Sequence, residues 1–224
     1  SNEINAFVTS GQKIFINTEL IVKSKTYDEY LGVLAHELAH INGGHISRTK
    51  NQITKLTDRS IPIYLLGILG ILGGETDAGV AALMVGSASV QDGYLYYSRN
   101  QEAAADQSAI SLLCESGQPS RGLERFLKTL DRENSQNTKD FQYKITHPII
   151  SDRYTWIKSS YIKFPDCINE IDLLLEKKFQ NVKAKLTAFT KNQNEVYALY
   201  IDEKNEFAQY AFAATNFFNG NQKE

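Results

Sequence analysis

The chain has 224 residues, a length that suits one compact catalytic domain with a modest helical appendage. Hydrophobic residues make up 42% of it, which is enough to bury a core and argues against an intrinsically disordered chain. The formal net charge of -2 offers no basic face, and like charges nowhere form a long run, so nucleic acid is not an expected partner.

The amino-terminal residues predict a β-hairpin followed by a helix. Over residues 4–22, β-branched and aromatic residues lie on each side of a turn at Ser10 and Gly11, which is the pattern of two short antiparallel strands. Apolar residues then recur at helical spacing over about 29–42, and the glycines at 43–44 end that pattern.

The segment 61–90 is apolar and rich in glycine, but the polar residues 75–77 interrupt it. A helix that crosses a membrane needs about 20 consecutive apolar residues, and neither half of the segment reaches that length. We therefore expect two buried helices rich in small residues. The alternative is a membrane-facing segment, or a lid beside an active site.

The second half of the chain reads as a series of helices. We expect helices over about 100–116, 120–132 and 151–162, a polar loop over 131–144, and amphipathic helices over 168–188 and about 204–219. The last helix resembles the first helix of a helical-hairpin repeat such as the TPR unit, which cannot bury its own face alone. The expected fold is therefore α+β and mostly helical, with a catalytic domain over 1–165 and a helical extension over 166–224.

The two cysteines, Cys114 and Cys167, are spaced neither as a metal knuckle nor as a redox pair. A disulfide between them would require an oxidising compartment and two side chains that meet in a restricted geometry. We expect both to pack as small apolar groups and assign them no chemistry.

The stretch VLAHELAHINGGH carries the strongest chemical signal in the chain. His36 and His40 are four residues apart, so a helix places both imidazoles on the same face, where they can bind one metal ion. Glu37 follows the first histidine, where its carboxylate can take a proton from a water that the metal activates. A helix with two incidental histidines is the alternative, but three of the four histidines fall within this stretch. The pattern is typical of zinc peptidases.

A third protein ligand could come from either of two places. His45 stands five residues after His40, one short of the metzincin spacing, so we reject it as a ligand and expect it to form local hydrogen bonds at the helix end. Glu102 and Asp106 lie four apart with small alanines between them, which allows close approach to a neighbouring helix. We expect Glu102 to bind the metal and Asp106 to accept the free ring N–H of His36 or His40. An exposed acidic pair is the alternative, although like charges at this spacing are mildly destabilising.

The order of these motifs resembles that of a known family. HELAH followed by EAAAD is similar to the gluzincin zinc peptidases of the HtpX, BepA and CAAX-prenyl-protease group. INAFVTSGQKIFINTELI resembles the hairpin of that family, and THPIISDRY resembles its His-Pro segment with a following arginine. The resemblance covers roughly residues 4–160, and it implies a gluzincin-type domain in which the small hairpin lies beside the HExxH helix.

The resemblance implies one zinc ion per chain, held by His36, His40 and Glu102. It implies that Glu37 is the catalytic base and that Asp106 contacts a ligand side chain without touching the metal itself. Peptides or proteins would be the substrates.

The resemblance further implies that Asn5, Ala6 and Phe7, on an edge strand, line the substrate cleft and pair with an extended peptide. Two basic residues leave alternatives open. His147 could stabilise the oxyanion, could occupy the fourth metal position and block the site at rest, or could merely cap a helix through the His-Pro turn. Arg153 could likewise act on the oxyanion or be a salt-bridge partner.

The function implied is that of a zinc-dependent endopeptidase that hydrolyses peptide bonds in proteins. The chain looks most like the envelope-located BepA branch, which implies a periplasmic, membrane-associated protein in protein quality control, with outer-membrane assembly machinery as a partner. No signal peptide is visible, and we expect residues to precede Ser1. Two alternatives stay open: a chaperone-like assembly factor that keeps its zinc and cleaves rarely, and a membrane-embedded protease that uses 61–90 as a spanning hairpin. The sequence predicts no oligomeric state.

Overall fold

The computed structural model describes part of the chain, namely residues 4–9, 11–45, 48, 88–133, 147, 151–165, 167 and 170–219. For residues 88–98, 132–133 and 151–152 it describes the backbone alone. The expectations for segment 61–90 therefore lie outside the described residues, apart from the backbone of its last three. The polar loop expected over 131–144 also lies outside them, except for residues 131–133.

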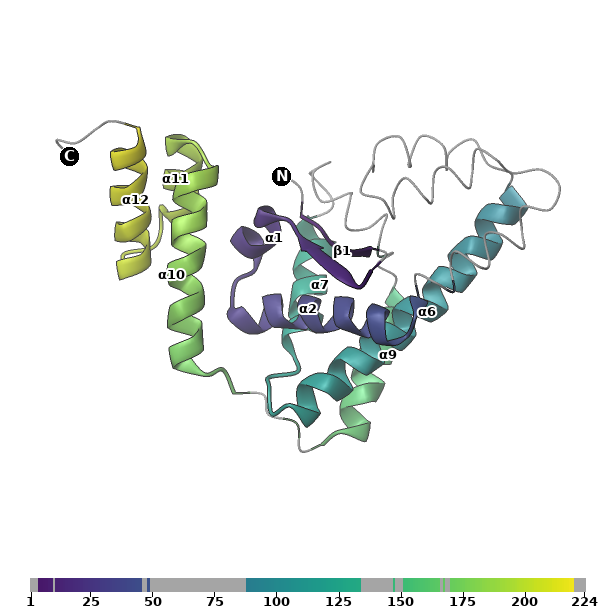
Figure 1. Cartoon of the computed structure of the whole chain (residues 1–224). Coiled ribbons are helices and arrows are strands. Elements are labelled where there is room, and N and C mark those ends of the chain that lie inside the picture. Colours follow the sequence, from purple (N-terminus) through teal and green to yellow (C-terminus); the bar gives the residue numbers. More distant parts are fainter. Residues whose placement is uncertain are drawn as a thin grey trace.

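The described chain is mostly helical with one small hairpin, which confirms the expected fold class (Figure 1). The elements are β1 (Ala6–Thr9), β2 (Lys13–Ile16), α1 (Thr18–Lys23), α2 (Tyr27–Asn42), α6 (Ala88–Glu115), α7 (Gly122–Glu133), α9 (Ser151–Lys163), α10 (Leu173–Thr190), α11 (Gln193–Tyr200) and α12 (Glu206–Phe218). None of these helices is both long enough and apolar enough to cross a membrane.

The hairpin pairs β1 with β2 in antiparallel register, with Ala6 opposite Ile16. The turn is tight because Gly11 takes a φ of 83°, a conformation that glycine adopts at little cost. Side chains alternate along β1, so Ala6 and Val8 are buried while Phe7 lies on the other face and stacks on Phe15 with ring centroids 5.3 Å apart. The buried face of β1 packs on α2.

Four helices enclose the main core. α2 packs against both α6 and α7, and α6 packs against α9 (Figure 1). α7 approaches α2 so closely that a Cβ added to Gly122 would lie 1.9 Å from the carbonyl oxygen of Asp28. A Cβ on Gly32 would likewise lie 2.5 Å from the backbone nitrogen of Leu123. These glycines bring α7 against the helix that carries the HELAH motif.

The carboxy-terminal helices form a unit with its own small core. α10 and α12 lie side by side at the left of Figure 1, and α11 packs against α12. The buried residues of this core are Ala184, Val196, Tyr200, Ala208 and Ala211. The two predicted helices are present as α10 and α12, whereas α11 was not expected. The division of the chain at residue 165 remains a prediction.

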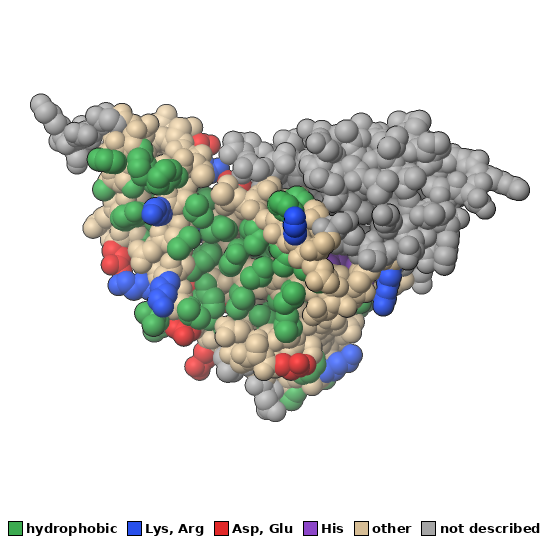
Figure 2. Space-filling model, viewed as in Figure 1, with side chains coloured by type: hydrophobic (Ala, Val, Ile, Leu, Met, Phe, Trp, Pro, Cys, Tyr) green, Lys and Arg blue, Asp and Glu red, His purple; other side chains and the backbone are tan. Residues whose placement is uncertain are grey.

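Apolar side chains also reach the surface of this unit. Several large apolar residues of α10 and α12 are exposed: Leu173, Leu174, Val182, Phe189, Tyr210, Phe217 and Phe218. Figure 2 shows apolar patches on the left of the molecule and across its middle, and very little histidine surface. All four histidines are indeed buried.

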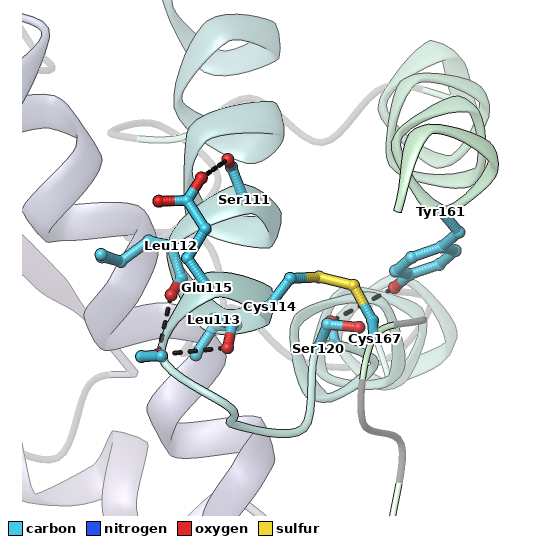
Figure 3. The surroundings of a disulfide bond; sticks show 9 residues. Ser111, Leu112, Leu113, Cys114, Glu115, Ser120, Tyr161 and Cys167 are labelled. Atoms are coloured by element: carbon cyan, nitrogen blue, oxygen red, sulfur yellow. Dashed lines mark hydrogen bonds between the residues drawn. A yellow bond between two sulfur atoms is a disulfide. The ribbon is translucent and has the colours of Figure 1, made fainter. Parts of the chain in front are cut away.

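The expectation for the cysteines was wrong, because Cys114 and Cys167 form a disulfide bond (Figure 3). The two residues are separated by 53 positions in sequence, and their Cα atoms lie 4.9 Å apart. α9 packs against α6 with Arg153, near its start, beside Asp106, and Cys167, after its end, meets Cys114 in the last turn of α6. Sequence spacing alone could not reveal this meeting, which depends on how the two helices pack.

We expect the disulfide to stabilise the fold. Reducing it, or replacing both cysteines by alanine, should lower the free energy of unfolding by about 3 kcal/mol, because a cross-link across a long loop restricts the unfolded chain. Urea unfolding followed by circular dichroism, with and without dithiothreitol, measures the difference. The double alanine variant is the control, since its curve should not respond to the reductant. Identical curves for the wild-type chain, once two free thiols have been titrated, would contradict the expectation.

Candidate metal centre

α2 presents two histidines and a glutamate within one helical turn. His36, Glu37 and His40 are all buried, with exposed fractions of 0%, 1% and 9%. The Nε2 atoms of the two histidines lie 3.0 Å apart. The spacing of four residues thus aims both imidazoles at one point, as expected for a helix.

α6 adds a carboxylate to this pair. Oε2 of Glu102 lies 3.2 Å from Nε2 of His36, and Oε1 lies 3.2 Å from Nε2 of His40. The helices can approach because the side of α6 next to Glu102 carries small residues, and Ala105 and Ala109 are fully buried. The structure therefore brings together the three side chains that the sequence nominated as ligands.

His147 joins the same group from the segment before α9. Its Nδ1 atom lies 3.2 Å from Oε2 of Glu102 and 3.3 Å from Nε2 of His36. Its Nε2 atom lies 3.2 Å from the carbonyl oxygen of Ala6 and 3.3 Å from Oε1 of Glu37. Ligand atoms of His36, His40, Glu102 and His147 all lie within 4.8 Å of one another, which is compact enough to hold a metal ion.

Two further charged residues, Asp106 and Arg153, contact members of the cluster without belonging to it. Oδ1 of Asp106 is 2.9 Å from Nδ1 of His36, so the aspartate contacts this histidine on the ring nitrogen that faces away from the cluster. Arg153 donates two hydrogen bonds to Asp106, from Nε to Oδ2 at 2.8 Å and from Nη2 to Oδ1 at 2.7 Å. Its Nη1 atom also lies 3.3 Å from Oε2 of Glu102. Neither Asp106 nor Arg153 has any exposed surface.

Burial and the neighbouring charges shift the pKa values of the residues in this cluster. Burial alone would lower the pKa of His36, but the carboxylates of Glu102 and Asp106 raise that pKa to about 10. At His40 burial prevails and lowers the pKa to about 4. Burial would raise the pKa of Glu102, yet the three surrounding histidines hold it well below its usual range. At neutral pH these shifts leave Glu102 ionised and His40 neutral, which are the forms that bind metals, whereas His36 carries a proton that a bound metal ion would displace.

These residues fit a divalent cation. Buried charges are expensive unless they are paired or coordinate a metal, and here an ionised carboxylate faces three imidazoles in a closed space. Neither carboxylate oxygen of the buried Glu37 accepts a hydrogen bond among the described residues. Two histidines and a glutamate, with an aspartate on the outer nitrogen of one imidazole, form a donor set that suits zinc.

The remaining expected residues have definite places. His45 lies outside the cluster, with its Nδ1 atom 2.9 Å from Nδ1 of His40, which matches the expected local hydrogen bonding. Gln101 was not singled out from the sequence, yet its side chain donates to the carbonyl oxygen of His45 at 3.1 Å. Asn5 is buried, and its carbonyl oxygen accepts from the backbone of Asn17 at 2.9 Å. The role of residues 5–7 in a substrate cleft remains a prediction.

The pairing of Arg153 with Asp106 can be tested through stability. We expect Arg153→Met to lower the free energy of unfolding by about 3–5 kcal/mol, because it leaves a buried aspartate without its partner. Lys128→Met is the matched control: Lys128 pairs with Glu124 while 44% exposed, and its loss should cost less than about 1 kcal/mol. Urea unfolding at neutral pH measures both. Equal losses in the two variants would refute the expectation.

Known proteins resemble this chain in the same region. It is 27% identical over 162 residues to the putative beta-barrel assembly-enhancing protease of Vibrio cholerae serotype O1, a match that covers 72% of this chain and 33% of that protein. It is also 27% identical over 156 residues to the beta-barrel assembly-enhancing proteases of Yersinia pestis and Escherichia coli K12, covering 68% of this chain and 31% of each protein. The chain thus spans about a third of the length of these relatives.

The family profile agrees with the motifs. The profile of peptidase family M48 matches residues 1–160, which include the hairpin, both motif helices and the His-Pro segment. Together with the cluster of histidines and glutamate it implies a bound metal ion. The resemblance drawn from HELAH and EAAAD is confirmed, and the chain belongs to peptidase family M48.

Proposed function

We propose that the chain is a zinc-dependent endopeptidase that hydrolyses peptide bonds in protein substrates. The observation that carries the proposal is the meeting of four buried ligand residues within 4.8 Å, with the carboxylate of Glu37 beside them. His36, His40 and Glu102 would hold one zinc ion per chain. A zinc ion bound there would acidify a water and polarise the scissile carbonyl.

Glu37 is the proposed general base. It takes the proton from the attacking water and passes it to the leaving amine. Burial raises the pKa of Glu37, which suits a carboxylate that must hold a proton between these two steps. Its oxygens accept no hydrogen bond among the described residues, and the nearest ring nitrogen, Nε2 of His147, lies 3.3 Å from Oε1.

Asp106 and Arg153 orient the ligands rather than touch the substrate. Asp106 contacts Nδ1 of His36, which leaves Nε2 of this ring to face the cluster. Arg153 is fully buried and directs its guanidinium at Asp106 and Glu102, so this geometry favours the salt-bridge alternative over an oxyanion contact.

The substrate would bind along the hairpin. Residues 5–7 include the start of β1, and the carbonyl oxygen of Ala6 lies 3.2 Å from His147, next to the cluster. An extended peptide that paired with this strand would bring its backbone to the general base. Asn5 and Phe7 would flank it.

His147 is proposed to block the site at rest. Its ring lies between Glu37 and Ala6, where a peptide and the attacking water would have to sit. It also contacts Glu102, so it can act as a fourth ligand. This placement favours the blocking role over oxyanion stabilisation.

We expect His147→Ala to raise the initial rate of casein cleavage severalfold, because the variant opens the space beside Glu37. Lys128→Ala is the control, since Lys128 is 44% exposed and pairs with Glu124, which is not a member of the cluster. If oxyanion stabilisation is the true role, the rate will instead fall by about 100-fold or more. Metal content must be measured on both variants, so that loss of the ion is recognised.

The cell envelope is the proposed location, with protein quality control as the role. The names of the relatives connect those proteins with the assembly of β-barrels. The disulfide agrees with an oxidising compartment such as the periplasm. A membrane surface and an outer-membrane assembly machine are the partners that this location would provide.

Glu37→Gln and Glu102→Ala test the peptidase itself. We expect Glu37→Gln to lose about 100- to 10,000-fold in cleavage rate while it keeps about one zinc per chain, because the base is removed and the ligands stay. Glu102→Ala should lose the zinc as well. Cleavage of a quenched protein substrate and elemental analysis measure the two effects.

The same variants discriminate the alternatives. A chaperone-like factor would keep its biological activity in Glu37→Gln although cleavage had stopped. A membrane-embedded protease would require detergent to remain in solution. Stoichiometric zinc in Glu102→Ala would remove the third ligand and, with it, the proposed site.

A further inference from the structure

The amino-terminal end of α2 lacks a cap from its own sequence. The first N–H groups of any helix need partners from outside the helix, and a threonine before the first turn commonly provides one. Thr26 holds that position in α2, but its side chain accepts no capping hydrogen bond. Its hydroxyl instead donates to Oδ1 of Asp28 at 2.6 Å. Glu29 of the same turn accepts from the backbone N–H of Lys25 at 2.7 Å, which lies before the helix, so neither side chain caps the N–H of Tyr27.

The residue that caps Tyr27 is Glu176, from α10. Its Oε2 atom accepts a hydrogen bond from the backbone N–H of Tyr27 at 2.9 Å, across 149 positions of sequence. Gln180, one turn further along α10, donates to Oε1 of Glu176 at 2.6 Å and to the carbonyl oxygen of Lys25 at 2.7 Å. The glutamine thus holds the carboxylate in place, and the negative charge lies at the positive end of the α2 dipole.

Further contacts extend this row along α10. Lys183 donates to the carbonyl oxygen of Ser24 at 2.9 Å. The backbone N–H of Asp172 donates to the hydroxyl of Tyr27 at 3.2 Å. The ring of Phe179 stacks on that of Tyr30 with centroids 5.9 Å apart. Helix α10 is therefore seated on the junction between α1 and α2.

We propose that Glu176 is a positioning residue that caps α2 from α10 and so fixes the helix that carries His36, Glu37 and His40. The matched profile of the peptidase family ends at residue 160, so α10 lies outside it. A helix rises about 1.5 Å per residue, which places His36 roughly 13 Å along the axis from Tyr27. Metal and catalytic groups tolerate errors of only about 0.5 Å, so a shift at the start of α2 would reach them.

The fold should survive without this cap. Arg125 of α7 pairs with Asp28 in the same turn of α2, and the glycines at 32 and 122 hold α7 against that helix. Removing Glu176 should therefore loosen the first turn of α2 without unfolding the core. The capping role is independent of the chemistry, and only its effect on the metal ligands rests on the proposed function.

Hydrogen exchange of the 224-residue chain tests the inference. In Glu176→Ala we expect the amides at the start of α2, residues 27–31, to exchange about fivefold faster, which is the usual effect of losing a cap. Glu176→Gln keeps an oxygen that can accept from Tyr27, and it should restore most of the protection. The metal-free chain is used, so the result does not depend on peptidase activity.

Lys177→Ala is the matched control. Lys177 is the next residue of α10, more than half exposed, and its ammonium lies 2.9 Å from the carboxylate of Glu206 in α12. It should leave exchange in α2 unchanged. The zinc-loaded chain adds a second measurement: zinc should dissociate faster from Glu176→Ala than from Lys177→Ala, as followed with a chromogenic chelator.

Two results would overturn the inference. Exchange at residues 27–31 that equals that of the wild-type chain would show that Glu176 is not the cap. Exchange that is faster to the same extent in α6 and α7 would show a general loss of stability instead. If Glu176→Ala does not fold, Gln180→Ala is measured in the same way, since it releases the carboxylate and should accelerate the same amides. A protein that fails to bind zinc, yet shows the expected exchange, would reject only the proposed function.

Discussion

The ionised carboxylate of Glu102 is the group on which the arrangement of the site depends. It lies fully inside the protein, within 3.3 Å of two histidines of α2, of His147 and of Arg153. A buried charge of this kind is tolerated only when partners surround it, and these come from α2, α9 and the segment before α9. The packing of α6 against α2 and α9 is therefore also an electrostatic requirement, and a metal ion would satisfy the same requirement from the centre of the group.

Much of this site follows from local sequence periodicity. A four-residue spacing on a helix has one geometric outcome, so the spacing of His36 and His40 is enough to pair them. The same reasoning linked Glu102 to Asp106, and three alanines between them indicated a close helix contact. The hairpin could be predicted in the same way, because β-branched and aromatic residues on each side of Ser10 and Gly11 indicate two strands and a turn. These features depend on neighbours in sequence, and for that reason sequence alone predicts them.

Contacts between distant segments were harder to predict. The disulfide joins Cys114 of α6 to a residue after α9, and their meeting depends on the path of the chain between them, which no spacing rule describes. The pairing of Arg153 with Asp106 could not be predicted for the same reason, since the arginine could face either the substrate or the aspartate. The short helix α11 was missed because its eight residues give little periodic signal, although Asn192 and Glu195 form a capping box that could have revealed it.

The helix α2 is held at both ends by groups from other parts of the chain. At its carboxy-terminal half the imidazoles are fixed by α6 and by His147, which lie within the matched part of the family. At its amino-terminal end the capping carboxylate comes from α10, beyond that part. The residue capped from α10 and the proposed metal ligands thus lie on one helix, about nine residues apart. The proposed cap would therefore link α10 to the geometry of the site.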